Sequence, residues 1–430
     1  MTRPLRILVL AEHCNPEWPS LPIVGYKYAR ALSKVAEITV VTHVRNRQNI
    51  EKAKELSDRV RYIDNEWLAA PMYRLERILR GGDEVAWSTS QIMSYLPYLA
   101  FERQAYTGFR SALSNNEFDI VHRVTPMSPA MPSYLSGRTN TPFVIGPLNG
   151  NLDWPAAFSG EQKREREGLR KLRGLYRYLP FARSTYKNAA CVMAGFQHTI
   201  DDLRSTNPAK IVPFPEIGFD PGVFHANGRT APFSGSGPKR FLFAGRLVPY
   251  KVPEAVVRAF ATSEVLKEHT LHIVGDGPEH ARLAQIVSAA GAEERVIFEG
   301  RKTQAEVADF MRQCDAFVFP SIRELGAGVV IEAMASGMVC LVTNYGAPGD
   351  LASNGRGVAI GLQPMEGLVN DYRKAMERCI ADPEPHATMA QKGHDYAHSY
   401  YDWDAKARYT LRVYEAILGG RDLSSFTEYR

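Results

Sequence analysis

Short apolar runs recur along the chain, and most are followed by a turn rich in Gly or Pro and then by a segment with helical spacing. The runs lie at residues 5–11, 38–42, 118–122, 142–145, 192–194 and 211–213, and again at 241–244, 271–274, 296–301, 316–319 and 339–343. Such runs are typical of strands buried on both faces of a parallel sheet, and their alternation with helices indicates βαβ units. The pattern predicts an α/β fold with doubly wound sheets, and residues 60–115 are expected to be helical.

The length of 430 residues is large for one hydrophobic core and suits two domains. Pro and Gly gather between residues 213 and 237, which is typical of a linker. The sequence therefore predicts an N-terminal domain over 1–213, a linker over 214–237 and a second domain over 238–395. The segment 396–430 is helical in pattern and is expected to return and pack on the N-terminal domain.

Composition narrows the functional class. The net charge of +5 is mild and does not call for a nucleic-acid partner. The five cysteines are scattered, with no C-x-x-C pair, which favours reduced thiols in a cytoplasm over a disulfide framework or a zinc site. The first apolar run is too short for a signal peptide, and no stretch approaches the roughly 18 apolar residues of a membrane span. Segment 275–278 lacks the third glycine of a dinucleotide fingerprint, so an NAD enzyme is disfavoured.

The stretch from Ala316 to Glu332 carries the clearest candidate chemistry. It predicts a buried strand, a short loop with Glu324, and a helix that begins near Gly326 and carries Glu332 about two turns in. Free backbone N–H groups at a helix start favour an anion, and two carboxylates beside them suit a ligand that is both a phosphate and a polyol. The alternative is that both glutamates are ordinary helix residues favoured by the helix dipole.

The spacing of Glu324 and Glu332 resembles the Glu-x7-Glu motif of retaining, nucleotide-sugar-dependent glycosyltransferases of the group 1, family 4-like type. Segment 245–251, Gly-Arg-Leu-Val-Pro-Tyr-Lys, is similar to the Gly-Arg-Leu-x-x-x-Lys segment of that family. The resemblance implies two Rossmann-like domains facing across a cleft, the GT-B fold. It also implies sugar transfer from a nucleotide-sugar donor without a metal ion or other cofactor, with Arg246 and Lys251 holding the diphosphate.

The resemblance also suggests roles for individual residues. Glu324 is expected to act in catalysis beside the sugar and Glu332 to bind the ribose. Further donor contacts are expected from Gly326, Ala327 and Arg301.

The N-terminal half matches the family less well. Gly25 stands where the family has a Gly-Gly pair, so it either approaches the diphosphate or is a turn glycine. His122 is expected at the carboxyl end of its strand, where it either takes part in catalysis or is structural. The family commonly has a second histidine at the position of Val124. Asn149 lies in the polar loop 146–151 and is the candidate for acceptor contacts.

The partners implied are the nucleotide-sugar donor and a glycan, lipid-linked or small-molecule acceptor. The basic, amphipathic segment 161–187 is a candidate for peripheral contact with an anionic membrane at its cytoplasmic face, or else a salt-bridged exposed helix. The Asp402-Trp403-Asp404 sequence precedes a helix, where Asp serves as a cap, so no metal role is assigned. Rival functions of the same architecture are a nucleotide-sugar epimerase, a phosphorylase or a catalytically inactive nucleotide-sugar-binding protein.

Overall fold

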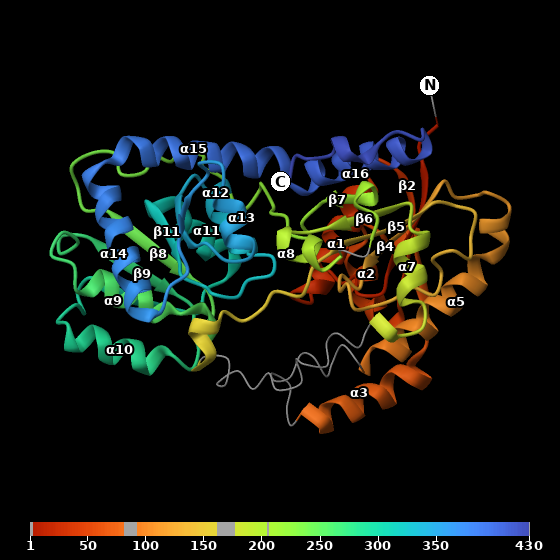
Figure 1. Cartoon of the computed structure of the whole chain (residues 1–430), viewed down its shortest axis with the longest axis horizontal. Coiled ribbons are helices and arrows are strands. Elements are labelled where there is room, and N and C mark those ends of the chain that lie inside the picture. The colour runs from red at the N-terminus through yellow and green to blue at the C-terminus, as the bar shows by residue number, and fades with distance from the viewer. Residues whose placement is uncertain (1–2, 81–92, 161–176, 204–205, 430) are drawn as a thin grey trace. The chain divides into compact units, whose positions relative to one another are not determined.

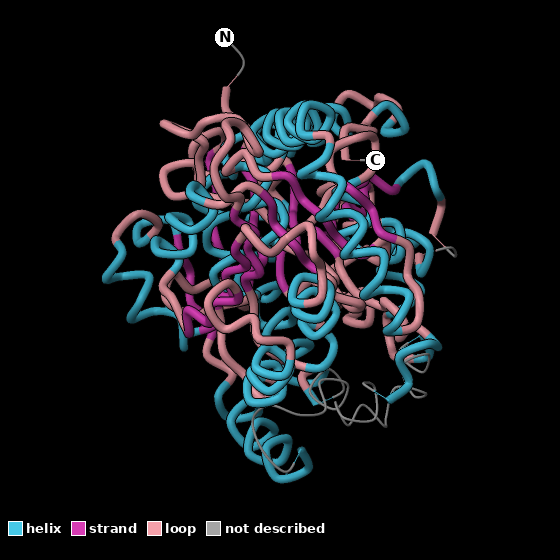
Figure 2. The backbone as a smooth tube through the Cα atoms, turned by 90° about the vertical axis from the view of Figure 1, so that its left-hand side faces the viewer, coloured by secondary structure: helices cyan, strands magenta, loops and turns pink. Residues whose placement is uncertain are grey.

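The computed structural model describes residues 3–80, 93–160, 177–203 and 206–429. The chain forms two compact units, each discontinuous in sequence. Unit 1 comprises Met1–Asn151, Arg166–Glu216 and Trp403–Arg430, and unit 2 comprises Leu152–Glu165 and Ile217–Asp402. Each unit has its own parallel sheet, and in Figure 2 the strands are covered by helices and loops. The predicted class, α/β with two doubly wound domains, is confirmed.

Unit 1 contains a seven-stranded sheet in the order β3-β2-β1-β4-β5-β6-β7. Its strands are β1 (Arg6–Ala11), β2 (Glu37–His43), β3 (Val60–Ile63), β4 (Ile120–Thr125), β5 (Phe143–Leu148), β6 (Cys191–Ala194) and β7 (Ile211–Pro213). All its strand pairs are parallel. Every residue of β4, β5 and β6 is buried, as expected for strands covered on both faces.

The helices of unit 1 include one from the far end of the chain. They are α1 (Leu21–Leu32), α2 (Arg47–Ala53), α3 (Glu66–Arg80), α5 (Tyr95–Ser114), α7 (Ala182–Asn188), α8 (Gln197–Asp202) and α16 (Trp403–Leu418). Helix α16 packs against α1, and the hydroxyls of Tyr28 and Thr410 lie 2.6 Å apart in this contact. Both hydroxyls are buried, so the bond satisfies two polar groups inside the interface.

Unit 2 contains a six-stranded parallel sheet in the order β10-β9-β8-β11-β12-β13. Its strands are β8 (Arg240–Ala244), β9 (Thr270–Val274), β10 (Val296–Gly300), β11 (Ala316–Phe319), β12 (Val339–Thr343) and β13 (Val358–Ile360). Its helices are α9 (Pro253–Ala261), α10 (His280–Ala289), α11 (Gln304–Gln313), α12 (Gly328–Ala335), α13 (Ala347–Ala352), α14 (Met365–Ala381) and α15 (Pro383–Tyr400). Helix α9 contacts α10 and α14, and α12 contacts α15 (Figure 1). The sheet is thus the centre of the core, with its strand ends open to loops.

Several element boundaries differ from those predicted. Helix α1 begins at Leu21, with Pro22 in its first turn, where the fixed φ of proline is already helical. Residues 60–115, predicted to be helical, include the edge strand β3. Strand β4 continues to Thr125, beyond the predicted end at His122.

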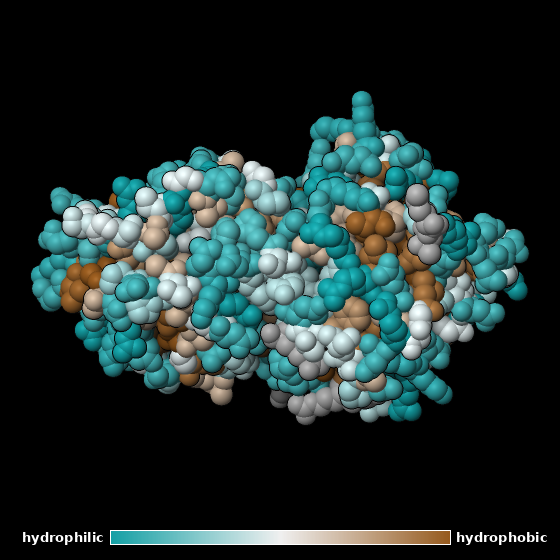
Figure 3. Space-filling model, turned by 90° about the horizontal axis from the view of Figure 1, so that it is seen from above, coloured by the Kyte–Doolittle hydropathy of each residue, from teal (hydrophilic) through white to brown (hydrophobic). Residues whose placement is uncertain are grey.

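The described residues contain no helix that is long and apolar enough to cross a membrane. On the face drawn in Figure 3 hydrophilic side chains predominate, and hydrophobic ones form separate patches. The predicted basic segment 161–187 lies outside the described residues over 161–176. Its remainder leads into α7.

Candidate functional site

The carboxyl ends of the strands of unit 2 carry most of the predicted donor-binding residues. Arg246 and Lys251 follow β8, Arg301 follows β10, and Glu324 follows β11. Because all strands of this sheet are parallel, these residues leave it at one edge. Ligands of open α/β sheets bind at that edge.

The loop after β8 is held by the loop after β9. Leu247 N donates to Asp276 O at 2.9 Å, and Glu279 N donates to Leu247 O at 3.0 Å. Gly275 has a φ of +136°, and a Cβ atom there would lie 1.9 Å from Gly245 O. A residue other than glycine therefore cannot occupy position 275 without moving the loop that carries Arg246.

Lys251 and Glu324 form a salt bridge between the β8 and β11 loops. The Lys251 side chain is 11% exposed and that of Glu324 15%. Ser321 Oγ donates to Glu324 Oε1 at 3.0 Å, and Lys251 Nζ lies 4.6 Å from the centre of the Phe319 ring. Both charges are thus fixed in position by neighbours on β11 and its loop.

Arg246 is exposed and donates from Nη2 to Tyr250 Oη at 2.7 Å. The backbone oxygen of Tyr250 accepts from Ile322 N at 3.0 Å and from Ser321 Oγ at 3.3 Å. Tyr250 therefore links the two loops that bear Arg246 and Glu324. Sequence reasoning did not single out Tyr250 or Ser321, although both lie within the two motifs.

The N-terminus of α12 lies beside this cluster. Its N-cap residue is Ala327, in the left-handed region at φ 50°, and it makes no side-chain capping bond. First-turn N–H groups that lack a capping side chain favour an anion. Glu332 lies in the second turn, half-buried, with Gln304 Nε2 at 3.4 Å from its Oε1. Gly326 lies in the loop just before the helix, and Arg301 is exposed.

A segment from before the predicted linker also belongs to this edge of unit 2. Tyr345 Oη donates to Asp153 O at 2.8 Å, and the Arg323 guanidinium lies 5.4 Å from the centre of the Trp154 ring. Leu152 lies so close to Gly346 that a Cβ on that glycine would meet it at 2.6 Å. Residues 152–154 therefore cover the loops next to Glu324, which no local sequence signal indicated.

The sequence predicted His122 at the carboxyl end of its strand, but in the structure His122 lies inside β4. Its side chain is fully buried, Nδ1 contacts Tyr414 Oη, and Nε2 lies 2.7 Å from Gly146 O. Burial lowers the pKa of His122 to about 4. Because both ring nitrogens have protein partners, His122 joins β4, β5 and α16 in the core and is left out of the proposed site.

Gly25 lies within α1 and not in the turn before it, which corrects its predicted position. A Cβ atom on Gly25 would lie 2.3 Å from His13 O, so the glycine lets the helix pack against the loop after β1. Asn149 follows β5, and its Nδ2 donates to Glu216 Oε1. Its Oδ1 lies 3.3 Å from His198 Nε2. These contacts hold Asn149 within unit 1, and its role toward an acceptor stays a prediction.

Within the described residues no group of three or more His, Cys, Asp and Glu side chains is placed to hold a metal ion. Asp404, in the first turn of α16, pairs with Lys34 at 2.7 Å. Metal independence stays a prediction.

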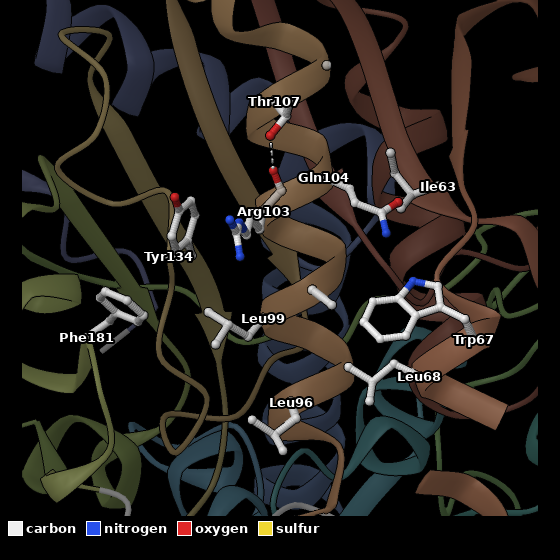
Figure 4. Close-up of a pocket in the computed structure, with 12 residues that line it drawn as sticks. Ile63, Trp67, Leu68, Leu96, Leu99, Arg103, Gln104, Thr107, Tyr134 and Phe181 are labelled. Carbon is white, nitrogen blue, oxygen red and sulfur yellow. Dashed lines mark hydrogen bonds between the residues drawn. The ribbon is translucent and has the colours of Figure 1, made fainter. Parts of the chain in front are cut away.

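A cavity of about 790 Å³ lies between α3 and α5 in unit 1 (Figure 4). Trp67 and Leu68 come from α3, and Leu96 and Leu99 come from α5. Arg103, further along α5, also lines it. The lining is mostly apolar, although Trp67 is 69% exposed and Leu96 49% exposed.

Comparisons with known proteins match much of the chain to glycosyltransferases. Residues 229–395 match the family described as glycosyl transferases group 1. The chain is 29% identical over 178 residues to a 2-deoxystreptamine glucosyltransferase of Streptomyces kanamyceticus, covering 41% of this chain and 45% of the relative. It is 30% identical over 242 residues to a D-inositol 3-phosphate glycosyltransferase of Kineococcus radiotolerans, covering 51% and 55%. The chain thus spans about half the length of the curated relatives it matches.

Solved structures resemble the whole chain. Sucrose-phosphate synthase from Thermosynechococcus elongatus has a TM-score of 0.59 at 16% identity, covering 97% of this chain and 100% of that one. A glycosyltransferase from Rickettsia africae has a TM-score of 0.61 at 13% identity, covering 97% and 99%. An Anabaena protein solved in complex with UDP and glucose has a TM-score of 0.56 at 17% identity, covering 95% and 100%. The predicted GT-B fold is confirmed, and residues 229–395 match the family of group 1 glycosyl transferases.

Proposed function

We propose that the protein transfers a glycosyl group from a nucleotide-sugar donor to a hydroxyl of an acceptor. The proposal also holds that anomeric configuration is retained and that no metal ion is needed. The observation that carries it is the cluster of Arg246, Lys251 and Glu324 beside the N-terminus of α12, inside the segment that matches the family. The Anabaena neighbour solved with UDP and glucose supports a nucleotide-sugar donor.

The cluster suits a reaction with a diphosphate leaving group. Two cations and the uncapped start of α12 are preorganised to stabilise negative charge as it develops. At a separation of ~4 Å and an effective dielectric of ~20, each cation contributes on the order of 4 kcal/mol before desolvation is subtracted. Because Lys251 is already held by Glu324 and by the Phe319 ring, its ammonium needs little reorganisation to meet a phosphate.

In the proposed reaction the bond from the anomeric carbon to the diphosphate oxygen breaks, and a bond to the acceptor oxygen forms on the same face. The acceptor proton passes to the leaving phosphate, so no separate base is required. Glu324 lies next to Lys251 and would stabilise positive charge on the sugar. Glu332 would accept hydrogen bonds from the ribose, the N–H groups from Gly326 and Ala327 onward would hold phosphate, and Arg301 would flank the base.

The test is acceptor-dependent release of nucleoside diphosphate from UDP-, GDP- and ADP-sugars, with and without EDTA. The Lys251→Ala variant should release almost no nucleoside diphosphate. Lys267→Ala is the matched control, since Lys267 pairs with Glu264 at an exposed position of the same unit. NMR of the product would report the anomeric configuration. Donor isomerisation without release indicates an epimerase, transfer to or from free phosphate indicates a phosphorylase, and donor binding without turnover indicates an inactive binder.

We propose in addition that unit 1 makes peripheral contact with an anionic membrane, which would bring it to a lipid-linked acceptor. The supporting observation is the apolar cavity with exposed Trp67 and Leu96 (Figure 4). Cations flank it, since Arg103 lines the cavity and the Arg138 guanidinium lies 4.8 Å from the centre of the Phe181 ring at its border. Exposed apolar side chains next to basic ones are typical of interfacial contacts.

Sedimentation with vesicles containing phosphatidylserine tests this contact. The protein should pellet at low salt and be released as salt is raised, because each basic side chain near such a surface contributes roughly 1 kcal/mol. The double variant Trp67→Ser, Leu96→Ser should bind at least tenfold more weakly. The control is Leu418→Ser, which changes an exposed leucine of α16. Protein that stays in the supernatant at low salt would instead favour an acceptor free in solution.

A further inference from the structure

A second cavity, of about 290 Å³, lies at the carboxyl ends of β1 and β2 in unit 1. Glu12 and His13 follow β1 directly, while His43 ends β2 and Arg45 and Asn46 follow it. This is the sheet edge at which open α/β folds bind ligands, and the volume suits a small ring. Nothing in the proposed donor site uses these residues.

His43 offers the cavity a fixed hydrogen-bond donor. It is 5% exposed, and its Nδ1 accepts from Arg45 N at 3.1 Å. In the neutral ring the proton must therefore be on Nε2. Among the described residues Nε2 makes no hydrogen bond of good geometry, although the Asn65 side chain is near enough to interact with the ring. The nearest carboxylate oxygen, Glu66 Oε1, lies 3.9 Å from Nε2, which is too far for a hydrogen bond.

Glu12 offers a fixed acceptor in the same cavity. Its backbone oxygen accepts from Asn46 Nδ2 at 2.8 Å and from Thr42 Oγ1 at 3.1 Å, so the loop after β1 is tied to β2. Its side chain is 14% exposed and lies 3.6 Å from His13 Nδ1. Burial raises the pKa of Glu12 to about 7, and burial lowers the pKa of His43. The pair therefore consists of a carboxyl group and a neutral imidazole N–H near neutral pH.

The mouth of the cavity is aromatic. Trp18 is 41% exposed and Tyr73 is 51% exposed, and both line the cavity. Flat aromatic faces beside a few polar groups suit a ligand with an apolar ring face and polar edges.

The charges in the cavity argue against an anionic ligand. Arg45 is the one arginine or lysine among the lining residues that the structure describes. Its guanidinium already makes two bonds to Glu66, one of them from Nη2 at 2.6 Å. With His13 and His43 kept neutral by burial, no lining cation is left over for a phosphate.

We propose that this cavity is the acceptor site of the protein and takes an uncharged, polyhydroxylated ring, a saccharide or cyclitol. One hydroxyl of the ring accepts from His43 Nε2 and donates to the Glu12 carboxyl group, while an apolar face of the ring lies against Trp18. This inference rests on the proposed function and names the acceptor class for it. It excludes a phosphorylated ring from the position between Glu12 and His43.

The pair His43→Asn and His43→Gln tests the donor role without removing the side chain. An Asn oxygen can replace Nδ1 in accepting from Arg45 N but places no donor at the position of Nε2. A Gln amide can reach that position. Saturation-transfer NMR with glucose and myo-inositol as probes should show ring protons in contact with the wild-type protein. His43→Asn should weaken that binding at least tenfold, and His43→Gln should restore most of it.

Further measurements separate this site from the donor site. Trp18→Ala should raise the acceptor KM at least tenfold with less than a threefold change in kcat, whereas Leu418→Ala, at similar exposure in unit 1, should change neither. UDP affinity should be unchanged in all these variants. Equal ring binding by wild type and His43→Asn, no binding of either probe to wild type, or tighter binding of inositol 3-phosphate than of inositol would overturn the inference. If ring binding depends on His43 but no diphosphate is ever released, the proposed function fails while the polyol site stands.

Discussion

Glu324 and Glu332 differ in their surroundings, and this difference predicts different effects of mutation. Glu324 is paired with Lys251 where charge would develop, so Glu324→Gln should lower kcat by roughly 100-fold and keep affinity for the free diphosphate. Glu332 would hold the ribose equally in ground and transition states. Glu332→Ala should therefore raise KM and the Kd of the nucleotide about tenfold with little loss of kcat. Calorimetry and steady-state kinetics would decide, and equal loss of diphosphate binding in both variants would contradict this placement.

Glu12 predicts how stability depends on pH. Its folded pKa, raised mainly by burial to about 7, exceeds the ordinary value of 4.5, so the folded state binds the proton more tightly. The associated stability is present below pH ~4.5 and is lost as the pH rises through 7. Between pH 4.5 and 8, the free energy of unfolding of the wild type should fall by up to about 3 kcal/mol relative to that of Glu12→Gln. Urea unfolding of both proteins at pH 5 and pH 8 measures this, and a constant difference would contradict it.

Sequence motifs identified single residues better than their contacts. Lys251 and Glu324 were both predicted as site residues, but the sequence did not indicate their salt bridge or the bonds to Tyr250 O, which join two loops about 70 residues apart in the chain. The proposed roles of Glu12 and His43 had no signal in the sequence, although each follows an apolar run, because one polar residue after a strand is a common feature. The surroundings of His122 were also not predictable, since its partner Tyr414 comes from the far end of the chain.

At the scale of elements, the interlocked loops after β8 and β9 predict a specific sensitivity. Gly275→Ala would place a methyl group against Gly245 O and should destabilise the fold by about 3 kcal/mol. Because Gly245 and Arg246 lie in the same loop after β8, the affinity for UDP should fall as well. Gly291→Ala is the matched control, with a φ of +58° but open space around it, and should cost about 1 kcal/mol. Thermal unfolding and UDP titration of the two variants measure the contrast, and similar effects would contradict the steric argument.

Buried strands were the elements best predicted from the sequence. The bounds of β7, β11 and β12 agree with the apolar runs, because a strand covered on both faces has no polar positions to blur its ends. The short edge strand β3 was not predicted, because two of its four residues are Arg61 and Tyr62 and it therefore lacks an apolar run. The start of α16 at Trp403 agrees with the helix expected at the Asp402-Trp403-Asp404 sequence.

At the scale of the whole molecule, the number of units was predictable but their membership was not. Composition predicted a linker over 214–237, and one boundary between the units lies between Glu216 and Ile217. Residues 152–165 belong to unit 2 and residues 403–430 to unit 1. Tertiary contacts such as Tyr345 with Asp153, and Lys406 Nζ with Pro215 O at 2.6 Å, define that membership. Such contacts join residues about 190 positions apart, beyond the reach of any local pattern.

The discontinuity of unit 2 decides how its gene can be recombined. A chimaera made by fusing the front of one relative to the back of another, at a single junction in 217–237, would take residues 152–154 from the wrong parent. Arg323 would then face a foreign residue at position 154, and α16 would meet the α1 of a different protein. Crossovers after residues 151, 165, 216 and 402 keep each unit from one parent. To transfer donor specificity from one relative to another, residues 152–165 and 217–402 should therefore be exchanged together, and exchange of the C-terminal half alone should not suffice.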